Sequence, residues 1–301
     1  MSAEPHSNSV VASASGYVGN VMWALRPHNW LKNFLLFVPA IMAQALSPSI
    51  LPPLCAAFCT FGCVASAHYL MNDLQDRDHD RNDIVKRRRP QAARLLLPRT
   101  AAGLAMVLIA VAVGCASWLP AGFQLALAAY LFLCLAYSFR LKRMPVVDVL
   151  ILAIVYDLRL AAGASAAMVV LPNTLLLACT CFFLTMAVLK RMTQLSASND
   201  LLGRLSGRPY RRDNLPALRL LAGATGAASV LTFAILLHDL GTHAARPGIL
   251  WLALPLLMTW LGRCFFLADR GKLNEDLVLF VITDLHSSIA LSALALLLIA
   301  A

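Results

Sequence analysis

The sequence predicts an all-α, polytopic membrane protein with nine transmembrane helices, and three observations support this prediction. Apolar residues make up 60% of the 301 residues. Charged residues make up only 13%, whereas a soluble domain carries about a quarter. Apolar runs of about 18 residues or more recur along the chain, which is the length of a helix that crosses a bilayer.

The nine expected spans cover residues 29–46, 50–71, 101–118, 121–139, 146–168, 172–190, 216–238, 248–267 and 277–300. Pro39 interrupts the first of them. Residues 1–20 are polar and Ser-rich and lack the long apolar core of a cleaved signal peptide. We therefore expect residues 1–20 to form a disordered cytoplasmic tail and residues 21–301 to form the intramembrane domain.

The basic residues predict the orientation of the chain. With the N-terminus in the cytoplasm, all but two of the 25 Lys and Arg residues fall on the cytoplasmic side. Arg246 lies outside, and Arg159 lies within a span. This asymmetry predicts a multi-pass protein of the cell (inner) membrane. The net charge of +10 is also explained, because the basic side of the protein faces anionic lipid headgroups and no nucleic acid partner is needed.

An acidic stretch, "NDLQDRDHD", follows the second expected span at residues 72–80. If the helix continues through it, Asp73, Asp76 and Asp80 share one face, at i, i+3 and i+7. Like charges in this arrangement repel one another, so we expect a divalent cation. Oxygen ligands suit Mg²⁺, and Asn72 can add an amide oxygen or orient a carboxylate. The alternative is a solvated, charged loop.

Four consecutive basic residues, Lys86 to Arg89, come next. Arginine forks match phosphate oxygens and lysine adds a point charge, so the run predicts a phosphate site. The alternative is a topology signal, and both can hold at once. The combined hypothesis is that acidic residues hold a metal ion and basic residues hold the phosphates of one diphosphate group.

The stretch at 72–80 resembles the first Asp-rich motif, NDxxDxxxD, of the UbiA-type intramembrane prenyltransferase superfamily. Asn72, Asp73, Asp76 and Asp80 match it position by position. The resemblance implies nine transmembrane helices around a central cavity that opens to the cytoplasm and to lipid. It also implies Mg²⁺ as the cofactor that handles a prenyl or sugar diphosphate.

Further segments resemble the polyprenyl-phosphate (decaprenyl-phosphate) phosphoribosyltransferase branch of that superfamily. They are "RPHNWLKNFLLFVP" at 26–39, "KRRRP" at 86–90, "YSFRLKRMPVVDVL" at 137–150, "LRLAAG" at 158–163 and "LKRMTQL" at 189–195. The last segment keeps the Lys190–Arg191 pair but changes its flanks. This branch implies phosphoribosyl diphosphate as the donor and a polyprenyl phosphate lipid as the acceptor.

The second Asp-rich motif of many aromatic-acceptor prenyltransferases is absent. Residues 190–215 contain only two isolated acids, Asp200 and Asp213. Between and around them stand Lys190, Arg191, Arg204, Arg208, Arg211 and Arg212. The second half of the expected site is therefore basic, which suits an anionic acceptor such as a lipid phosphate better than a neutral aromatic ring.

The fifth expected span carries charge, which is costly in a membrane and usually functional. Asp148 and Arg159 are three helical turns apart and so share a face. Arg159 is the candidate for a phosphate, and Asp148 for orienting a basic group or a ribose hydroxyl; burial with a partner is the alternative.

Tyr137 and Lys142 are expected to line a second phosphate site. Lys32 is expected beside the cavity, with an interfacial anchor as the alternative.

These observations predict a Mg²⁺-dependent membrane transferase of cell envelope biosynthesis whose active site faces the cytoplasm. The catalytic and metal-binding residues would be Asp73, Asp76 and Asp80. The residues that bind donor phosphates would be Lys86, Arg87 and Arg89, and those that hold the acceptor phosphate would be Lys190, Arg191 and Arg159. One alternative moves a prenyl group from a prenyl diphosphate to an aromatic or other acceptor. A transporter or lipid-binding scaffold is the other, and a homo-oligomer is left open.

Overall fold

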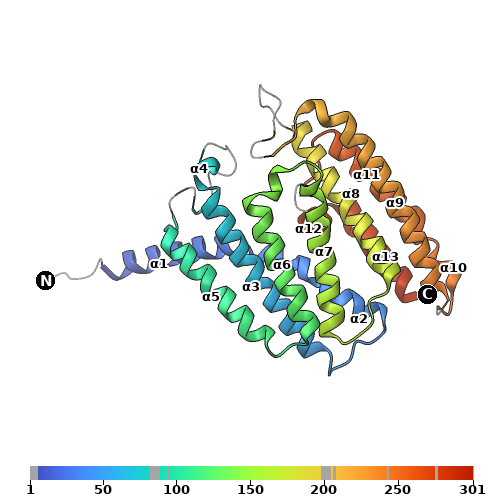
Figure 1. Ribbon diagram of the computed structural model, residues 1–301, viewed down its shortest axis with the longest axis horizontal. Coiled ribbons are helices and arrows are strands. Elements are labelled where there is room, and N and C mark those ends of the chain that lie inside the picture. The colour runs from blue at the N-terminus through green and yellow to red at the C-terminus, as the bar shows by residue number, and fades with distance from the viewer. Residues whose placement is uncertain are drawn as a thin grey trace. The chain divides into compact units, whose positions relative to one another are not determined.

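The computed structural model describes residues 6–81, 89–91, 93, 95–197, 205, 208–242, 244–274 and 277–300. These residues form helices and no β-strand (Figure 1). In this part of the chain, seven helices are long and apolar enough to cross a membrane: Leu51–Gln75, Pro98–Ala116, Ala121–Phe139, Val147–Ala166, Asn173–Ala197, Arg212–Gly241 and Pro247–Asp269. They confirm the all-α prediction and seven of the nine expected spans.

The other two expected spans take a different form, so the count of nine is not confirmed. Residues expected in the first span form a 3₁₀ helix, η1 (Pro27–Phe37), followed by a short α-helix, α2 (Val38–Met42). The last expected span is divided at Asp284 into α12 (Leu277–Thr283) and α13 (Leu285–Ala300). Asp284 accepts a hydrogen bond from the Ser287 N–H (2.9 Å) and both its oxygens pair with Arg263 (2.7 Å each).

The chain divides into two compact units, and each is described by itself. Unit 1 comprises Met1–Leu131 and Ala162–Val169. It contains α1 (His6–Leu25), η1, α2, α3 (Leu51–Gln75), α4 (Arg77–Asp80), α5 (Pro98–Ala116) and the first part of α6 (Ala121–Phe139). Helix α3 is its centre, because it packs against α1, η1 and α5.

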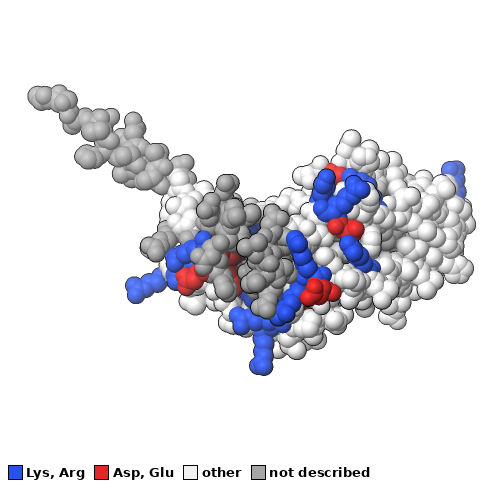
Figure 2. Space-filling view, turned by 90° about the horizontal axis from the view of Figure 1, so that it is seen from above, with Lys and Arg blue, Asp and Glu red and all other residues white. Residues whose placement is uncertain are grey.

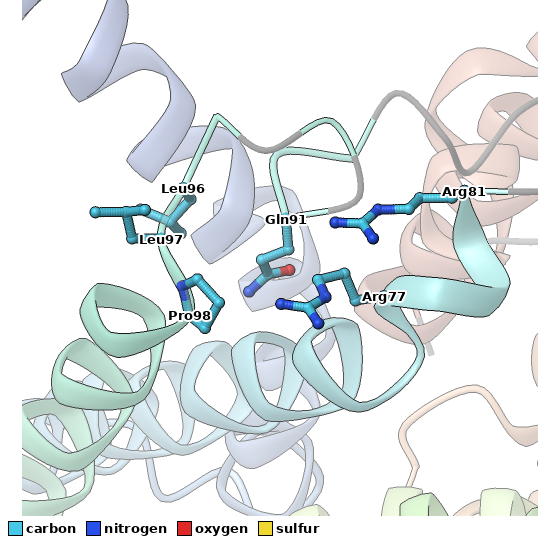
Figure 3. A pocket seen from close by; sticks show the side chains of 6 residues that line it. All are labelled: Arg77, Arg81, Gln91, Leu96, Leu97 and Pro98. Atoms are coloured by element: carbon cyan, nitrogen blue, oxygen red, sulfur yellow. The ribbon is translucent and has the colours of Figure 1, made fainter.

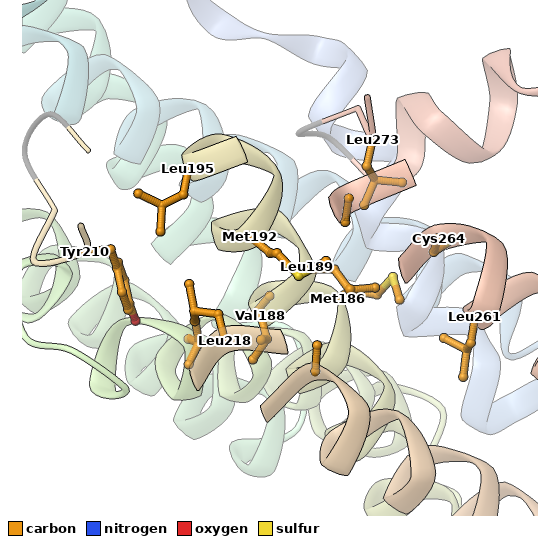
Figure 4. Packing of buried hydrophobic residues seen from close by; sticks show 14 of the residues in the cluster. Met186, Val188, Leu189, Met192, Leu195, Tyr210, Leu218, Leu261, Cys264 and Leu273 are labelled. Atoms are coloured by element: carbon orange, nitrogen blue, oxygen red, sulfur yellow. The ribbon is translucent and has the colours of Figure 1, made fainter. Parts of the chain in front are cut away.

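Unit 2 comprises Phe132–Ala161 and Val170–Ala301. Its main elements are α7 (Val147–Ala166), α8 (Asn173–Ala197), α9 (Leu215–Gly241), α10 (Pro247–Leu250), α11 (Ala253–Asp269), α12 and α13. Helix α8 packs against α9 and α11. The core between them contains buried Val188, Leu189 and Met192 of α8, against Leu218 and Cys264 (Figure 4).

Proline marks where many of these helices begin. It stands at the first or second position of η1, α2, α3, α5, α9 and α10. Its fixed φ is compatible with the first helical turn, where its missing N–H would have no intrahelical partner. The helix starts therefore follow directly from the sequence.

Two glycines bring η1 close to its neighbours in unit 1. A Cβ at Gly163 would lie 2.0 Å from the carbonyl oxygen of Leu36, and one at Gly62 would lie 2.6 Å from the Trp30 ring. Small residues allow such close approach between helices in membranes. The Trp30 indole N–H donates to the Ser66 hydroxyl (2.9 Å), which donates to the Leu25 carbonyl (2.8 Å). These contacts fix the position of η1 on α3.

Large apolar side chains are exposed on the outer surface, as expected for contact with lipid. Trp118, Met168 and Val170 are 91%, 83% and 86% exposed. Charge is confined: on the face drawn in Figure 2, Lys and Arg side chains gather in patches with Asp and Glu between them, and most of the remaining described surface is uncharged. The protein is thus a multi-pass membrane protein.

Candidate functional site

The acidic stretch at 72–80 is not one continuous helix. Helix α3 ends at Gln75, and Asp76 lies at its C-cap with φ −86° and ψ 1°. The short helix α4 then begins at Arg77. Some helical hydrogen bonds persist, since the Asp80 N–H donates to the Asp76 carbonyl (2.8 Å). The expectation of an unbroken helix with three carboxylates on one face is therefore wrong at Asp76.

Two arginines neutralise the first and last of these carboxylates. Asp73 and Asp80 are buried, at 2% and 4% exposure, so each needs a compensating charge. Arg26 Nη2 donates to both Asp73 oxygens (2.8 and 2.7 Å). Arg89 Nη1 donates to Asp73 Oδ1 (3.0 Å) and to Asp80 Oδ2 (2.7 Å). We call Asp73, Asp80, Arg26 and Arg89 the acidic cluster.

Sequence reasoning assigned Arg26 only to the cytoplasmic positive charges, so its place in the acidic cluster was missed. Its backbone is left-handed (φ 50°, ψ 56°), which is uncommon for a residue other than glycine. Such strain persists only where surrounding contacts fix it. Here the Asp73 ion pair and the Tyr69 ring, 5.0 Å from the guanidinium carbon, provide those contacts. The signal in the sequence was its position at the start of "RPHNW".

The remaining residues expected at this site are placed as follows. Asn72 Nδ2 donates to Asp76 Oδ2 (3.2 Å), so the amide orients that carboxylate. Lys32 Nζ donates to Asn29 Oδ1 (2.5 Å). Lys86 and Arg87 lie outside the described residues.

A cluster of three carboxylates is not formed here. Among the residues the structure describes, no three His, Cys, Asp or Glu side chains stand close enough to hold a metal ion. The reason is local, because the Asp76 carboxylate is bonded to Asn72 and a guanidinium bridges Asp73 and Asp80. What the geometry does provide is two buried carboxylates that face one cationic nitrogen.

A second cluster lies in unit 2 and is centred on Arg191 of α8, which is 1% exposed. Its Nε donates to Asp148 Oδ2 (2.7 Å), its Nη1 to Gln194 Oε1 (2.6 Å) and its Nη2 to the Tyr137 hydroxyl (2.9 Å). Asp148, from α7, is fully buried and also accepts a hydrogen bond from the Tyr210 hydroxyl. Burial and that hydrogen bond raise the pKa of Tyr210, so its hydroxyl stays protonated.

Arg208 adds a further cation to the same place. Its Nη1 donates to the Tyr137 hydroxyl (2.7 Å) and to the Lys142 carbonyl (3.3 Å), and its guanidinium carbon lies 5.1 Å from the centre of the Tyr137 ring. Burial, and then the nearby charge of Arg191, lower the pKa of Arg208. Lys142 is buried, at 6% exposure. We call Arg191, Arg208, Lys142, Asp148, Tyr137 and Tyr210 the basic cluster.

The described side chains of the basic cluster include two arginines beside one carboxylate. Arg191 pairs with Asp148, and Arg208 shares the Tyr137 hydroxyl with Arg191, so a second cation stands beside this pair. Buried charge of one sign is costly unless an ion of the other sign accompanies it. The cluster is therefore suited to bind an anion, and phosphate matches its arginine forks.

The structure brings together some of the predicted residues of this site and places others differently. Tyr137, Lys142, Asp148 and Arg191 belong to one cluster, as described above. Arg159 donates instead to the Val155 carbonyl of its own helix (2.7 Å) and lies over the Tyr156 ring (5.5 Å). Asp148 and Arg159 both lie on α7, and the ion pair of Asp148 is with Arg191 of α8.

Lys190 is partly exposed and lies next to Arg191 within α8. Tyr210 and Gln194 were missed because neither carries a charge that marks it in the sequence. Arg208 was counted among the basic residues of 190–215 but was not assigned to the site. The signal for Arg208 and Tyr210 was their place together in the basic segment "GRPYRRDNL" at 207–215.

Comparison with known proteins agrees with this description. Residues 33–289 match the UbiA prenyltransferase family. Nodulation protein NoeC of Azorhizobium caulinodans is 33% identical over 277 residues, which cover 91% of this chain and 90% of that protein. The decaprenyl-phosphate phosphoribosyltransferase of Corynebacterium glutamicum is 30% identical over 262 residues, which cover 82% and 77%.

A UbiA homologue from Archaeoglobus fulgidus, solved with GPP and Mg²⁺, superposes with a TM-score of 0.69 at 19% identity. The superposition covers 92% of this chain and 99% of that one. At this identity the match shows the fold. The helical architecture, the sequence relatives and the matched residues lead to one conclusion: the chain belongs to the UbiA prenyltransferase family.

Proposed function

We propose that this UbiA-family membrane enzyme transfers 5-phosphoribose from phosphoribosyl diphosphate to a polyprenyl phosphate. A phosphate oxygen of the lipid forms a bond to the anomeric carbon of ribose. The bond from that carbon to diphosphate breaks, and diphosphate leaves with the electron pair. Positioning of the two phosphate-bearing substrates and stabilisation of their charge would supply most of the rate.

The observation that carries this proposal is the pair of arginines, Arg191 and Arg208, beside the single carboxylate of Asp148 in the basic cluster. A lipid phosphate would balance the second positive charge, whereas a neutral aromatic acceptor would not. The relative from C. glutamicum, named a decaprenyl-phosphate phosphoribosyltransferase, supports the same acceptor class at 30% identity. This is why we favour phosphoribosyl transfer over prenyl transfer to an aromatic ring.

Within the basic cluster the proposed roles differ. Asp148, Gln194 and Tyr137 already engage three N–H groups of Arg191, so we assign Arg191 mainly to positioning. Arg208 lies beside Arg191, and Lys142 contacts Arg208 through its carbonyl; Arg208 and Lys142 are the proposed contacts of the acceptor phosphate. Lys190 and Arg159 remain proposed contacts of the same phosphate.

The acidic cluster is the proposed site of the donor diphosphate and of Mg²⁺. Asp73 and Asp80 place carboxylate oxygens around one cationic nitrogen, and Mg²⁺ binds such oxygens together with phosphate oxygens. When bound, Mg²⁺ would neutralise charge on the departing diphosphate. Asp76 is the proposed third ligand, oriented by Asn72. Arg89, with Lys86 and Arg87, would then bind donor phosphates.

The asymmetry of basic residues supports a site that faces the cytoplasm from the inner membrane. The proposal is tested by a transfer assay on purified full-length protein with Mg²⁺, radiolabelled phosphoribosyl diphosphate and a polyprenyl phosphate. Two variants probe the two clusters, Asp73→Asn and Arg208→Gln. Arg219→Gln is the matched control, because Arg219 is an exposed arginine of unit 2 that pairs with Asp269 (2.6 Å).

We expect labelled lipid from the wild type and from Arg219→Gln. Loss of one charged hydrogen bond to phosphate should lower kcat/KM of Arg208→Gln by roughly 10–100-fold, mainly through KM for the lipid. Asp73→Asn should lower the rate with every acceptor. Absence of labelled lipid, together with Mg²⁺-dependent turnover of a prenyl diphosphate and an aromatic acceptor, would refute the proposal and favour prenyl transfer.

A further inference from the structure

Unit 1 contains a pocket of about 330 Å³ that lies outside the acidic cluster (Figure 3). Its lining residues come from α4, from the segment after it and from the start of α5: Arg77, Arg81, Gln91, Leu96, Leu97 and Pro98. None of them is a residue of the acidic or the basic cluster. The pocket therefore needs a separate explanation.

The first feature of the pocket is a pair of arginines. Arg77 and Arg81 are one helical turn apart, and their side chains are 33% and 32% exposed. Both contact the same oxygen of Asp78, at 3.4 and 2.9 Å, and Asp78 is itself 74% exposed. Exposed ion pairs of this kind are weak. Both guanidinium groups line the pocket, and such groups favour an anion with phosphate-like geometry.

The second feature is Gln91, which is 98% buried, at 2% exposure. Its Nε2 donates to the Leu70 carbonyl (3.1 Å), which fixes the orientation of the amide. Its Oε1 is buried and accepts no hydrogen bond from the part of the chain that the structure describes. Figure 3 shows this side chain between the two arginines on one side and Leu97 and Pro98 on the other. Buried acceptors normally have a donor, so a ligand with a hydroxyl group would complete the site.

The third feature is the position of the pocket relative to the membrane-spanning helices. Candidate span α5 begins at Pro98, and candidate span α3 ends at Gln75, just before Arg77. Leu97, at the rim, is 68% exposed. The pocket thus combines two guanidinium groups, the Gln91 amide oxygen and an apolar rim. It lies where two candidate spans end, which is the depth of lipid headgroups.

We propose that this pocket binds the headgroup of an anionic membrane phospholipid. Arg77 and Arg81 hold the phosphodiester, Gln91 Oε1 accepts a hydrogen bond from a headgroup hydroxyl, and Leu96, Leu97 and Pro98 contact the start of the acyl chains. Free phosphate shares the charge of this ligand but lacks the hydroxyl and the chains. The pocket goes beyond the proposed transfer reaction, because neither substrate is assigned to it.

The test measures lipid binding to the purified full-length protein in mild detergent by native mass spectrometry. Three lipids with the same acyl chains are compared: phosphatidylglycerol, phosphatidylmethanol and phosphatidylcholine. Phosphatidylmethanol carries the same phosphodiester charge as phosphatidylglycerol but has no hydroxyl. We expect phosphatidylglycerol to bind best, phosphatidylmethanol about tenfold more weakly because one hydrogen bond is lost, and phosphatidylcholine more weakly still.

The variant Arg77→Gln/Arg81→Gln should lower affinity for phosphatidylglycerol by about 10–100-fold. Arg99→Gln is the matched control, because Arg99 is exposed in the first turn of α5 and does not line the pocket. Equal affinity of the double variant and this control would overturn the proposal. So would equal binding of phosphatidylglycerol and phosphatidylmethanol by the wild type. Displacement of the lipid by inorganic phosphate at similar concentration would identify a free-anion site and refute the lipid assignment.

Discussion

The substitution Asp148→Asn tests the buried ion pair at the centre of the basic cluster. Asp148 accepts hydrogen bonds from Arg191 Nε (2.7 Å) and from the Tyr210 hydroxyl. Asparagine keeps the shape but removes the charge, and its NH₂ group replaces one acceptor with a donor. Arg191 would then be buried without its counterion. Breaking a buried pair in this way costs about 3–5 kcal/mol.

The chain offers a matched control in the same unit. Arg219 and Asp269 form an ion pair with the same Nε–carboxylate geometry at 2.6 Å, but their side chains are 48% and 38% exposed. The Arg191–Asp148 side chains are 1% and 0% exposed. An exposed pair contributes about 0–1 kcal/mol. Asp269→Asn should therefore have little effect, and the difference between the two variants isolates the contribution of burial.

The assay is thermal unfolding of both variants in the same detergent. At about 2–4 °C per kcal/mol, Asp148→Asn should lower Tm by roughly 10 °C and Asp269→Asn by no more than about 4 °C. The double variant Asp148→Asn/Arg191→Met, which removes both charges, should recover part of the loss. Equal shifts in Tm for Asp148→Asn and Asp269→Asn would refute the reasoning that burial makes the Arg191–Asp148 pair more costly to break than an exposed pair.

Two further predictions concern packing and capping. Gly163→Ala should destabilise unit 1 by about 1–3 kcal/mol or more, because its Cβ would lie 2.0 Å from the Leu36 carbonyl oxygen. The control is Gly103→Ala, which has open space at its Cβ and should leave Tm unchanged or raise it. An unchanged Tm for Gly163→Ala would contradict the close approach of η1 at this glycine. Asp284→Ala should cost about 1–3 kcal/mol, because it removes the ion pair with Arg263 and the acceptor at the first turn of α13, and an unchanged Tm would contradict both roles.

Hydrophobicity predicted most of the fold because a long apolar run indicates a membrane-spanning helix without information from the rest of the chain. Seven expected spans match helices for this reason. Hydrophobicity did not predict the places where the backbone departs from a continuous α-helix. A run of apolar residues does not distinguish a 3₁₀ helix at Pro27–Phe37 from an α-helix, and it does not predict a break at Asp284.

The candidate site was predictable only within single segments. Helical spacing identifies residues on one face of one helix, so it associated Asp148 with Arg159. The partner of Asp148 is Arg191, 43 positions away on another helix. Arg26 and Asp73, 47 positions apart, are related in the same way. Such pairs depend on tertiary packing, and neither composition nor periodicity contains that information.

The 3₁₀ helix η1 has a consequence for how far a short segment can reach. A 3₁₀ helix rises about 2.0 Å per residue and an α-helix about 1.5 Å. The 11 residues of η1 therefore extend roughly 22 Å, and the five residues of α2 add roughly 8 Å. The sum approaches the roughly 30 Å of bilayer hydrocarbon with only 16 residues. The combined axial length of η1 and α2 is thus nearly that of a full span, and the three-residue repeat of η1 aligns Trp30, Asn33 and Leu36 in a single row.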